Sequence, residues 1–153
     1  MNQRIGARLL ELGMSLPSPP PAVGSYRPSA RQGDLVYTSG QLPFVDGTLL
    51  IRGKVGVEVP VEEAVEAARI CAVNALAAAS VVTDLDAVTH VLKMTAYIAC
   101  PPGFIEQATV ANGASDLLVE VFGELGSHAR AAVGVAALPL DAPVELEMIL
   151  GLG

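Results

Sequence analysis

The stretch 127-SHARAAVGVAALPLDAPVELEMILGLG-153 decides the fold that this sequence predicts. Residues 131–137 are small and β-branched, residues 138–143 are bracketed by two prolines, and residues 144–150 alternate with a period of two. This pattern predicts a strand, a turn and a second strand. One face of the second strand would then carry Val144, Leu146, Met148 and Leu150, and the other face would carry Glu145 and Glu147.

Arg130 is the single Lys or Arg in this largely apolar stretch. If the two strands pair, Arg130 lies near Glu145 or Glu147. A cation held beside a carboxylate on a rigid sheet suits the binding and turnover of a small anion. The alternative is an ion pair at the edge of the sheet that adds little stability.

Two helices and a long strand are predicted upstream of this stretch. Residues 60–82 begin with proline, carry glutamates in the first turns and are rich in alanine, which indicates a helix. Residues 88–99 indicate a long, central strand on which His90 is a packing residue. Residues 104–121 indicate a second helix. Asn112-Gly113 weakens the middle of this helix and is an alternative point at which it can begin.

The N-terminal part predicts further strands and an extension. Residues 35–43 indicate a strand, Asp46-Gly47 a hairpin turn, and residues 49–59 the partner strand. Residues 1–14 have the spacing of a short amphipathic helix, and the four prolines of residues 16–23 favour an extended arm. The order of elements predicts an α+β fold with a mixed sheet and two helices on one face.

Composition limits the possible functions. Charged residues make up only 16% of the 153 residues, and the mean hydropathy is +0.50. We therefore expect the uncovered sheet face to meet other copies of the chain in a homo-oligomer. The net charge of −7 and the absence of a basic run argue against nucleic-acid binding. No apolar run approaches the length of a membrane span, so we expect neither membrane insertion nor a signal peptide.

Cysteine and histidine usage argues against disulfides and metal. Cys71 and Cys100 are too few for a disulfide framework and indicate reduced thiols in a cytoplasmic protein. The two histidines, His90 and His128, have no further ligand at metal-binding spacing, so no metal site is predicted.

Two segments present candidate binding residues. Tyr26 follows Gly24-Ser25, so a bend can present its phenol to a pocket, although packing on a neighbouring strand is the simpler interpretation. Ser39-Gly40 interrupts the strand over residues 35–43. A glycine inside a strand marks either a bulge or the close approach of a ligand.

Several of these segments together resemble the YjgF family, also called the Rid family of reactive-intermediate deaminases or endoribonuclease L-PSP. The resemblance covers residues 21–150 and rests on 36-VYTSGQLP-43, Ala129-Arg130, Val133, Leu138-Pro139 and 144-VELE-147. It implies a chorismate-mutase-like α+β fold in a homotrimer, with three clefts between neighbouring subunits. The chain is then one domain, residues 1–153, with an N-terminal extension over about residues 1–20.

The resemblance also implies roles for individual residues. Arg130 matches the arginine that binds the substrate carboxylate, and Glu145 matches the glutamate that positions the attacking water. Tyr26, Ser39 and Gly40 match positions that line the cleft.

Three further positions match the family less closely. Asn112 falls near the position of a helix asparagine in the family. Arg130, however, lies one residue further along the chain from Asn112 than the family pattern predicts. Ala132 lies where the family commonly has cysteine. Its backbone groups can still line the cleft, because their position depends on strand geometry and not on the side chain. His128 stands where proline is common, two residues before Arg130, and we expect it to influence substrate choice at the cleft mouth.

The implied reaction is the hydrolysis of 2-imino acids, or their enamine tautomers, to 2-keto acids and ammonia, as in a 2-iminobutanoate/2-iminopropanoate deaminase, without metal or cofactor. The departures from the family pattern indicate a divergent branch. The alternative is a non-catalytic trimeric protein that binds small carboxylates in the same cleft. An RNA-cleaving role suits an acidic chain poorly.

Overall fold

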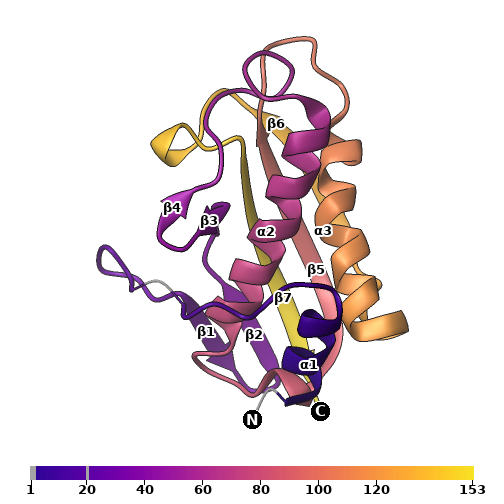
Figure 1. Ribbon diagram of the computed structural model, residues 1–153. Helices are drawn as coiled ribbons and strands as arrows, with labels where there is room; N and C mark the ends of the chain where they lie inside the picture. The colour runs from indigo at the N-terminus through magenta and orange to yellow at the C-terminus, as the bar shows by residue number, and fades with distance from the viewer. Residues whose placement is uncertain (1–2, 20) are drawn as a thin grey trace.

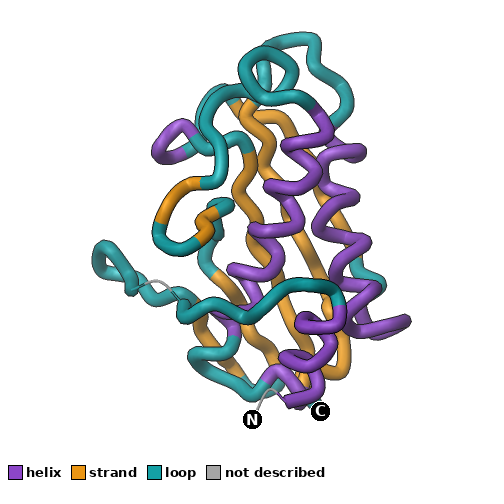
Figure 2. The backbone as a smooth tube through the Cα atoms, in the orientation of Figure 1, coloured by secondary structure: helices purple, strands orange, loops and turns teal. Residues whose placement is uncertain are grey.

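The computed structural model describes residues 3–19 and 21–153, which form a five-stranded mixed sheet with helices on one face (Figures 1 and 2). The strand order is β1-β2-β7-β5-β6, and only the β5–β6 pair is parallel. The strands are β1 (Ser29–Gln32), β2 (Leu35–Thr38), β5 (Val88–Ala99), β6 (Ala129–Val135) and β7 (Val144–Leu152). A separate small hairpin pairs β3 (Phe44–Val45) with β4 (Thr48–Leu49). The predicted α+β class is confirmed.

Two long helices lie side by side over the sheet (Figure 1). They are α2 (Val61–Ala79) and α3 (Gln107–Phe122), close to the two predicted helices. The prediction that α3 can begin at Asn112-Gly113 is wrong, because the helix starts five residues before Asn112. Short 3-10 turns are η1 (Leu85–Ala87), η2 (Gly123–Gly126) and η3 (Pro139–Asp141).

Gly113 lies in the middle of α3 because α2 passes close to it. A β-carbon at this position would collide with the backbone carbonyl oxygen of Val65 in α2. Small residues on both helices allow this approach, since most of the alanines of α2 are fully buried. The loss of helix propensity at Gly113 is therefore offset by packing between the helices.

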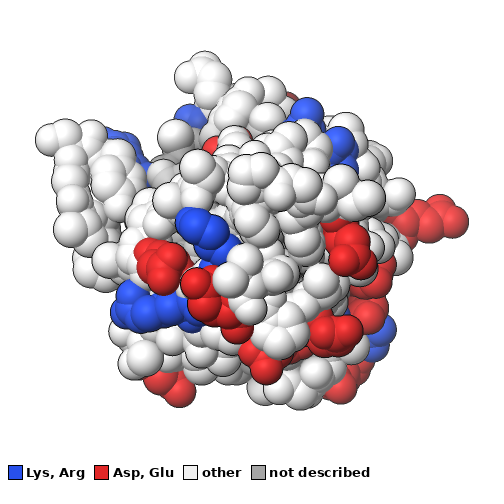
Figure 3. Space-filling model, turned by 90° about the horizontal axis from the view of Figure 1, so that it is seen from above, with Lys and Arg blue, Asp and Glu red and all other residues white. Residues whose placement is uncertain are grey.

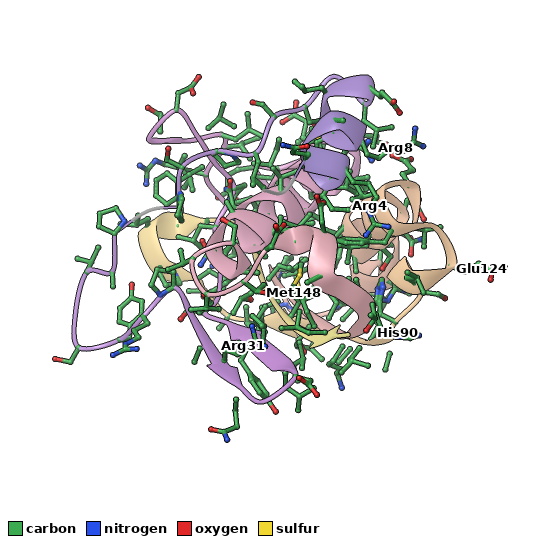
Figure 4. The ribbon with its side chains drawn as sticks, turned by 90° about the horizontal axis from the view of Figure 1, so that it is seen from below. Arg4, Arg8, Arg31, His90, Glu124 and Met148 are labelled. Atoms are coloured by element: carbon green, nitrogen blue, oxygen red, sulfur yellow. The ribbon has the colours of Figure 1, made fainter. Side chains whose placement is uncertain are left out.

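The predicted alternation of β7 is confirmed. Val144, Leu146, Met148 and Leu150 are buried beneath the helices, and Glu145, Glu147 and Ile149 are half-buried on the opposite face. Figure 4 shows Met148 between the helices and the sheet. Because β7 is internal to the sheet, this alternation separates a dry core face from an open face.

The predicted pairing of β6 with β7 is wrong, because β5 lies between them. The crossover through α3 places β6 parallel to β5, while β7 runs antiparallel along the other side of β5. Residues 136–143 therefore span an intervening strand, which is a distance of about 10 Å at the usual strand spacing. The long strand β5, half of whose residues are buried, is stabilised by two neighbours instead of one.

Two further predictions are corrected by the backbone. The predicted partner strand over residues 49–59 is short, since it pairs with β3 only at Thr48–Leu49. Gly53 and Gly56 adopt positive φ angles of 114° and 88°. In β5, register shifts next to His90 and Val91 interrupt the regular pairing with β7, and the prediction that His90 packs in the structure is wrong. Val91 is buried, whereas His90 is exposed instead of packed.

The N-terminal helix α1 (Gln3–Glu11) packs onto the domain core through Ile5 and Leu9, which are 1% and 0% exposed. The carboxylate of Asp86 accepts hydrogen bonds from the backbone N–H groups of Arg4 and Ile5, at 3.1 and 3.0 Å. Arg8 donates to the carbonyl oxygen of Glu120 in α3, and Figure 4 shows both arginines on α1. The predicted amphipathic helix therefore forms and is anchored at both ends.

Charge is sparse on the molecular surface seen from above (Figure 3). Acidic side chains gather along one side of this view, and uncharged surface prevails elsewhere. No helix within the described ranges is long and apolar enough to cross a bilayer.

We predict that Gly113→Ala destabilises the protein by about 1–3 kcal/mol, because the added methyl group overpacks the contact with α2. Gly6→Ala is the matched control, since Gly6 lies in α1 with open space around it and should gain up to about 1 kcal/mol from helix propensity. Urea unfolding of both variants measures the two free energies. A stabilising effect of Gly113→Ala would contradict the close helix contact.

Candidate functional site

Arg130 lies on the edge strand β6 and points toward α3. Its Nη1 donates hydrogen bonds to Asn112 Oδ1 at 2.7 Å and to Ser115 Oγ at 3.1 Å. Asn112 and Ser115 share one face of α3 because they are three residues apart. Within residues 3–19 and 21–153, Nε and Nη2 of the exposed Arg130 make no hydrogen bond. One arm of the guanidinium group is therefore fixed while the remaining donors face solvent.

His128 continues this network on the other side of Ser115. Its Nδ1 lies 2.6 Å from the carbonyl oxygen of Gly126, and its Nε2 lies 3.0 Å from Ser115 Oγ. A shallow cavity of about 210 Å³ is lined by Ser115, His128 and Arg130, together with Asp116, Val119 and Ser127. His128 and Asn112 were singled out from the sequence, and Ser115 was missed. Its position three residues after Asn112 on a helix was the available signal.

Glu145 lies on the open face of β7. Partial burial raises the pKa of the Glu145 carboxyl, and the negative charge of Glu147 raises it further. Tyr97, which is opposite Glu145 on β5, donates from its hydroxyl to Glu147 Oε1 at 2.9 Å. The structure thus has two carboxylates on one strand face, of which Glu145 holds its proton more tightly than an ordinary glutamate.

Gly40 makes room for Glu145. A β-carbon at residue 40 would occupy the same space as the Glu145 carboxylate, so any side chain there would displace it. Gln41 holds the two segments together, because its backbone exchanges two hydrogen bonds with Leu146 at 2.8 and 3.0 Å. The interruption of the strand at Ser39-Gly40 therefore allows a close approach between the segment and a carboxylate.

Tyr26 and Gly40 line a cavity of about 390 Å³ whose other walls are mainly apolar. The Tyr26 side chain is 55% exposed, so it is not packed on a neighbouring strand. Ser39 Oγ donates to the carbonyl oxygen of Arg27, and its backbone N–H donates to that of Pro28. Ser39 thus fixes the bend that precedes Gly40 and presents no free hydroxyl in this arrangement.

The structure brings the candidate residues into two separate groups. The Arg130 group comprises Arg130, Asn112, Ser115 and His128 on the helix side of β6. The Glu145 group comprises Glu145, Gly40 and Tyr26 beside the open face of β7. Arg130 is level with buried Met94 and Met148, so its side chain and that of Glu145 leave the sheet on opposite faces.

This separation corrects the expectation that Arg130 lies near Glu145 or Glu147 in one chain. Ala132 belongs to neither group through its side chain, which packs against the core, and its backbone is level with Ala96 of β5. A site that uses both Arg130 and Glu145 therefore needs two copies of the chain.

Comparison with known proteins gives one family. Residues 6–149 match the family described as "YjgF/chorismate mutase-like, putative endoribonuclease". The curated protein TCP17 of Trypanosoma cruzi is 40% identical over 151 residues, which cover 97% of this chain and 94% of TCP17.

Two solved structures resemble this chain to different degrees. A protein of unknown function from Agrobacterium tumefaciens is 43% identical with a TM-score of 0.90, over 99% of this chain and 94% of that one. RidA from the Antarctic bacterium Psychrobacter sp. is 29% identical with a TM-score of 0.59, over 88% and 94%. The fold is therefore chorismate-mutase-like, and it is more similar to the Agrobacterium protein than to RidA.

We predict that Glu147→Gln lowers the pKa of Glu145, because it removes the neighbouring negative charge. The pKa should remain above that of an ordinary glutamate, since burial is the larger cause. Carboxyl ¹³C NMR over a pH titration measures the shift directly. Glu124→Gln, at an exposed position in η2 (Figure 4), is the control and should leave the titration unchanged.

The same pKa has a consequence for stability. A folded-state pKa above the unfolded value means that the folded protein binds the proton more tightly, so the free energy of unfolding falls as the pH rises between the two values. Glu147→Gln should reduce this fall. A variant that titrates like the wild type would show that Glu147 does not act on Glu145.

Proposed function

The chain belongs to the YjgF/chorismate mutase-like family, and we propose that it hydrolyses reactive 2-imino acids, or their enamine tautomers, to 2-keto acids and ammonia. The observation that carries this proposal is the arrangement of Arg130. Asn112 and Ser115 fix one arm of its guanidinium group, and the remaining donors are exposed beside a cavity.

Arg130 binds the substrate carboxylate. A guanidinium group offers two parallel N–H donors that match the two oxygens of a carboxylate, and a lysine ammonium group lacks this fork. Because Nη1 is already engaged by α3, the group is oriented before the substrate arrives. Less side-chain entropy is then lost on binding.

Glu145 positions the attacking water and accepts its proton. Its raised pKa, caused first by burial and then by Glu147, makes it a stronger base than an exposed glutamate. Gly40 leaves the carboxylate close to the Tyr26 cavity, where an imine carbon can approach. Hydrolysis of an imine needs only an oriented substrate, a placed water and proton transfer, so this small set of groups is sufficient.

The two groups complete one site when two copies meet. The open face of the sheet, with Glu145, is covered by no helix among the described elements. We propose a homotrimer in which Arg130 of one copy and Glu145 of its neighbour face one cleft. Burial of the open sheet face between copies supplies the free energy of assembly.

The second candidate function is binding of small carboxylates without turnover. It is favoured by the greater similarity to a protein of unknown function than to RidA, and by alanine at position 132. Arg130 is needed for both functions, whereas Glu145 is needed chemically only for hydrolysis.

We predict that the wild type accelerates the loss of 2-aminoacrylate and 2-aminocrotonate generated in situ by a threonine/serine dehydratase. Arg130→Ala and Arg130→Lys should each lower kcat/KM by about 100-fold or more through lost charge-assisted hydrogen bonds. Glu145→Gln should lower kcat by about 100-fold while pyruvate binding is retained.

Arg31→Ala is the matched control for these variants, because Arg31 lies on the opposite edge strand β1 (Figure 4). Wild-type protein that binds pyruvate through Arg130 and leaves both enamines untouched would instead establish the binding function.

Mixing two inactive variants tests whether the site is shared between copies. If Arg130 and Glu145 come from different copies, random co-assembly of Arg130→Ala with Glu145→Gln should restore about a quarter of the wild-type activity, because each site draws one residue from each neighbour. Unfolding and refolding of the equimolar mixture exchanges the subunits. If both residues come from one copy, the mixture stays inactive.

A further inference from the structure

Ser115 and His128 form a continuous hydrogen-bond chain that ends at the exposed cavity beside Arg130. We infer that this pair is a proton relay that protonates the substrate nitrogen while water attacks. The inference rests on the proposed imine hydrolysis, to which it adds an acid on the Arg130 side of the site.

The carbonyl oxygen of Gly126 determines the histidine tautomer. A carbonyl oxygen only accepts hydrogen bonds, so His128 Nδ1, 2.6 Å away, carries a proton. In the neutral ring Nε2 is then an acceptor, and the Ser115 hydroxyl at 3.0 Å donates to it. Arg130 Nη1 donates to the same Ser115 oxygen at 3.1 Å. The Ser115 hydroxyl therefore donates a hydrogen bond to a base, and its oxygen accepts one from a cation.

Protonation of the ring reverses the direction of the Ser115 hydrogen bond. In the imidazolium form both ring nitrogens are donors, so Nε2 donates to Ser115 Oγ. The serine proton is then released toward the cavity that Ser115, His128 and Arg130 line. The charged groups at this cavity, Asp116 of α3 and Arg130 of β6, have opposite signs. A proton can thus pass from the ring to a bound molecule through one hydroxyl.

A bound 2-imino acid places its nitrogen within reach of this hydroxyl. The carboxylate lies on the free donors of Arg130, and the imine carbon that carries the nitrogen is bonded directly to the carboxylate carbon. Ser115 Oγ is only 3.1 Å from the same guanidinium group. The base Glu145 comes from the neighbouring copy, so acid and base approach the imine from opposite sides.

The proton balance closes over two steps. As the water oxygen bonds to the imine carbon, Glu145 takes a water proton, the π electron pair moves to nitrogen, and nitrogen takes the Ser115 proton, which His128 Nε2 replaces. In the second step the C–N bond breaks with its electron pair on nitrogen. Between the steps Glu145 gives its proton to solvent and His128 takes one from solvent. Glu145 then accepts the hydroxyl proton of the forming carbonyl, and the departing nitrogen takes a Ser115 proton, which His128 Nε2 replaces. The same exchange with solvent follows. Both groups are regenerated.

Chemical rescue distinguishes the relay from a contact that only ties α3 to β6. His128→Gly should lower kcat by about 100-fold with little change in KM, because Arg130 still binds the carboxylate. Added imidazole should restore turnover of the 2-aminocrotonate-derived imine. Among substituted imidazoles, the restored rate should follow the acid strength of the imidazolium ion. A purely structural histidine would show no such dependence.

The two histidines of the chain provide a matched control, since His90→Gly changes an exposed histidine outside this network (Figure 4) and should keep wild-type activity. Ser115→Ala should be as slow as His128→Gly and should not respond to imidazole, because the hydroxyl that passes the proton is gone. Circular dichroism and pyruvate binding confirm that each variant is folded with Arg130 in place.

Each outcome is decisive. Rescue by imidazole in His128→Gly but not in Ser115→Ala supports the relay. Full activity of His128→Gly, or a folded variant that imidazole fails to rescue, overturns the relay and leaves the proposed deaminase function standing. Wild-type protein without activity on any imine overturns the proposed function and, with it, the proton relay that depends on that function.

Discussion

The position of β5 between β6 and β7 is the constraint on which the candidate site depends. It places Arg130 on the edge of the sheet, level with buried Met94, so the guanidinium group leaves on the helix side and meets Asn112 and Ser115. Glu145 leaves β7 on the other face, two strands away. One chain therefore holds each chemical group in a rigid setting but cannot bring them together.

Close helix packing supports this arrangement. Gly113 lets α3 approach α2, and on the same helix Asn112 and Ser115 flank this contact and engage Arg130. A small shift of α3 would move both acceptors away from the guanidinium group. The helix contact and the hydrogen bonds of Arg130 are therefore coupled through a few residues of α3, and close packing against α2 explains the glycine of low helix propensity at position 113.

The two sides of the proposed cleft differ in their chemistry. The Arg130 side presents a cation, a serine hydroxyl and a histidine joined by hydrogen bonds of 3.0 and 3.1 Å. The Glu145 side presents a carboxylate of raised pKa beside a mainly apolar cavity. A small molecule with a carboxylate at one end and a reactive carbon next to it suits this combination, because in the proposed cleft the cation faces the anion on one side and the carboxylate faces water on the other.

The sequence by itself determined the α+β class, the two core helices and the alternation of β7, because hydrophobic periodicity is a local property of the chain. It also set Arg130 apart as an isolated charge, whereas only the family resemblance distinguished Glu145 from Glu147. Tertiary structure decided which strands are neighbours. A short turn after β6 predicts a hairpin, but the crossover through α3 and the burial of β5 place a third strand in the gap. The hydrogen bonds of Ser115 likewise emerged only from the fold, since its partners His128 and Arg130 are 13 and 15 residues away along the chain.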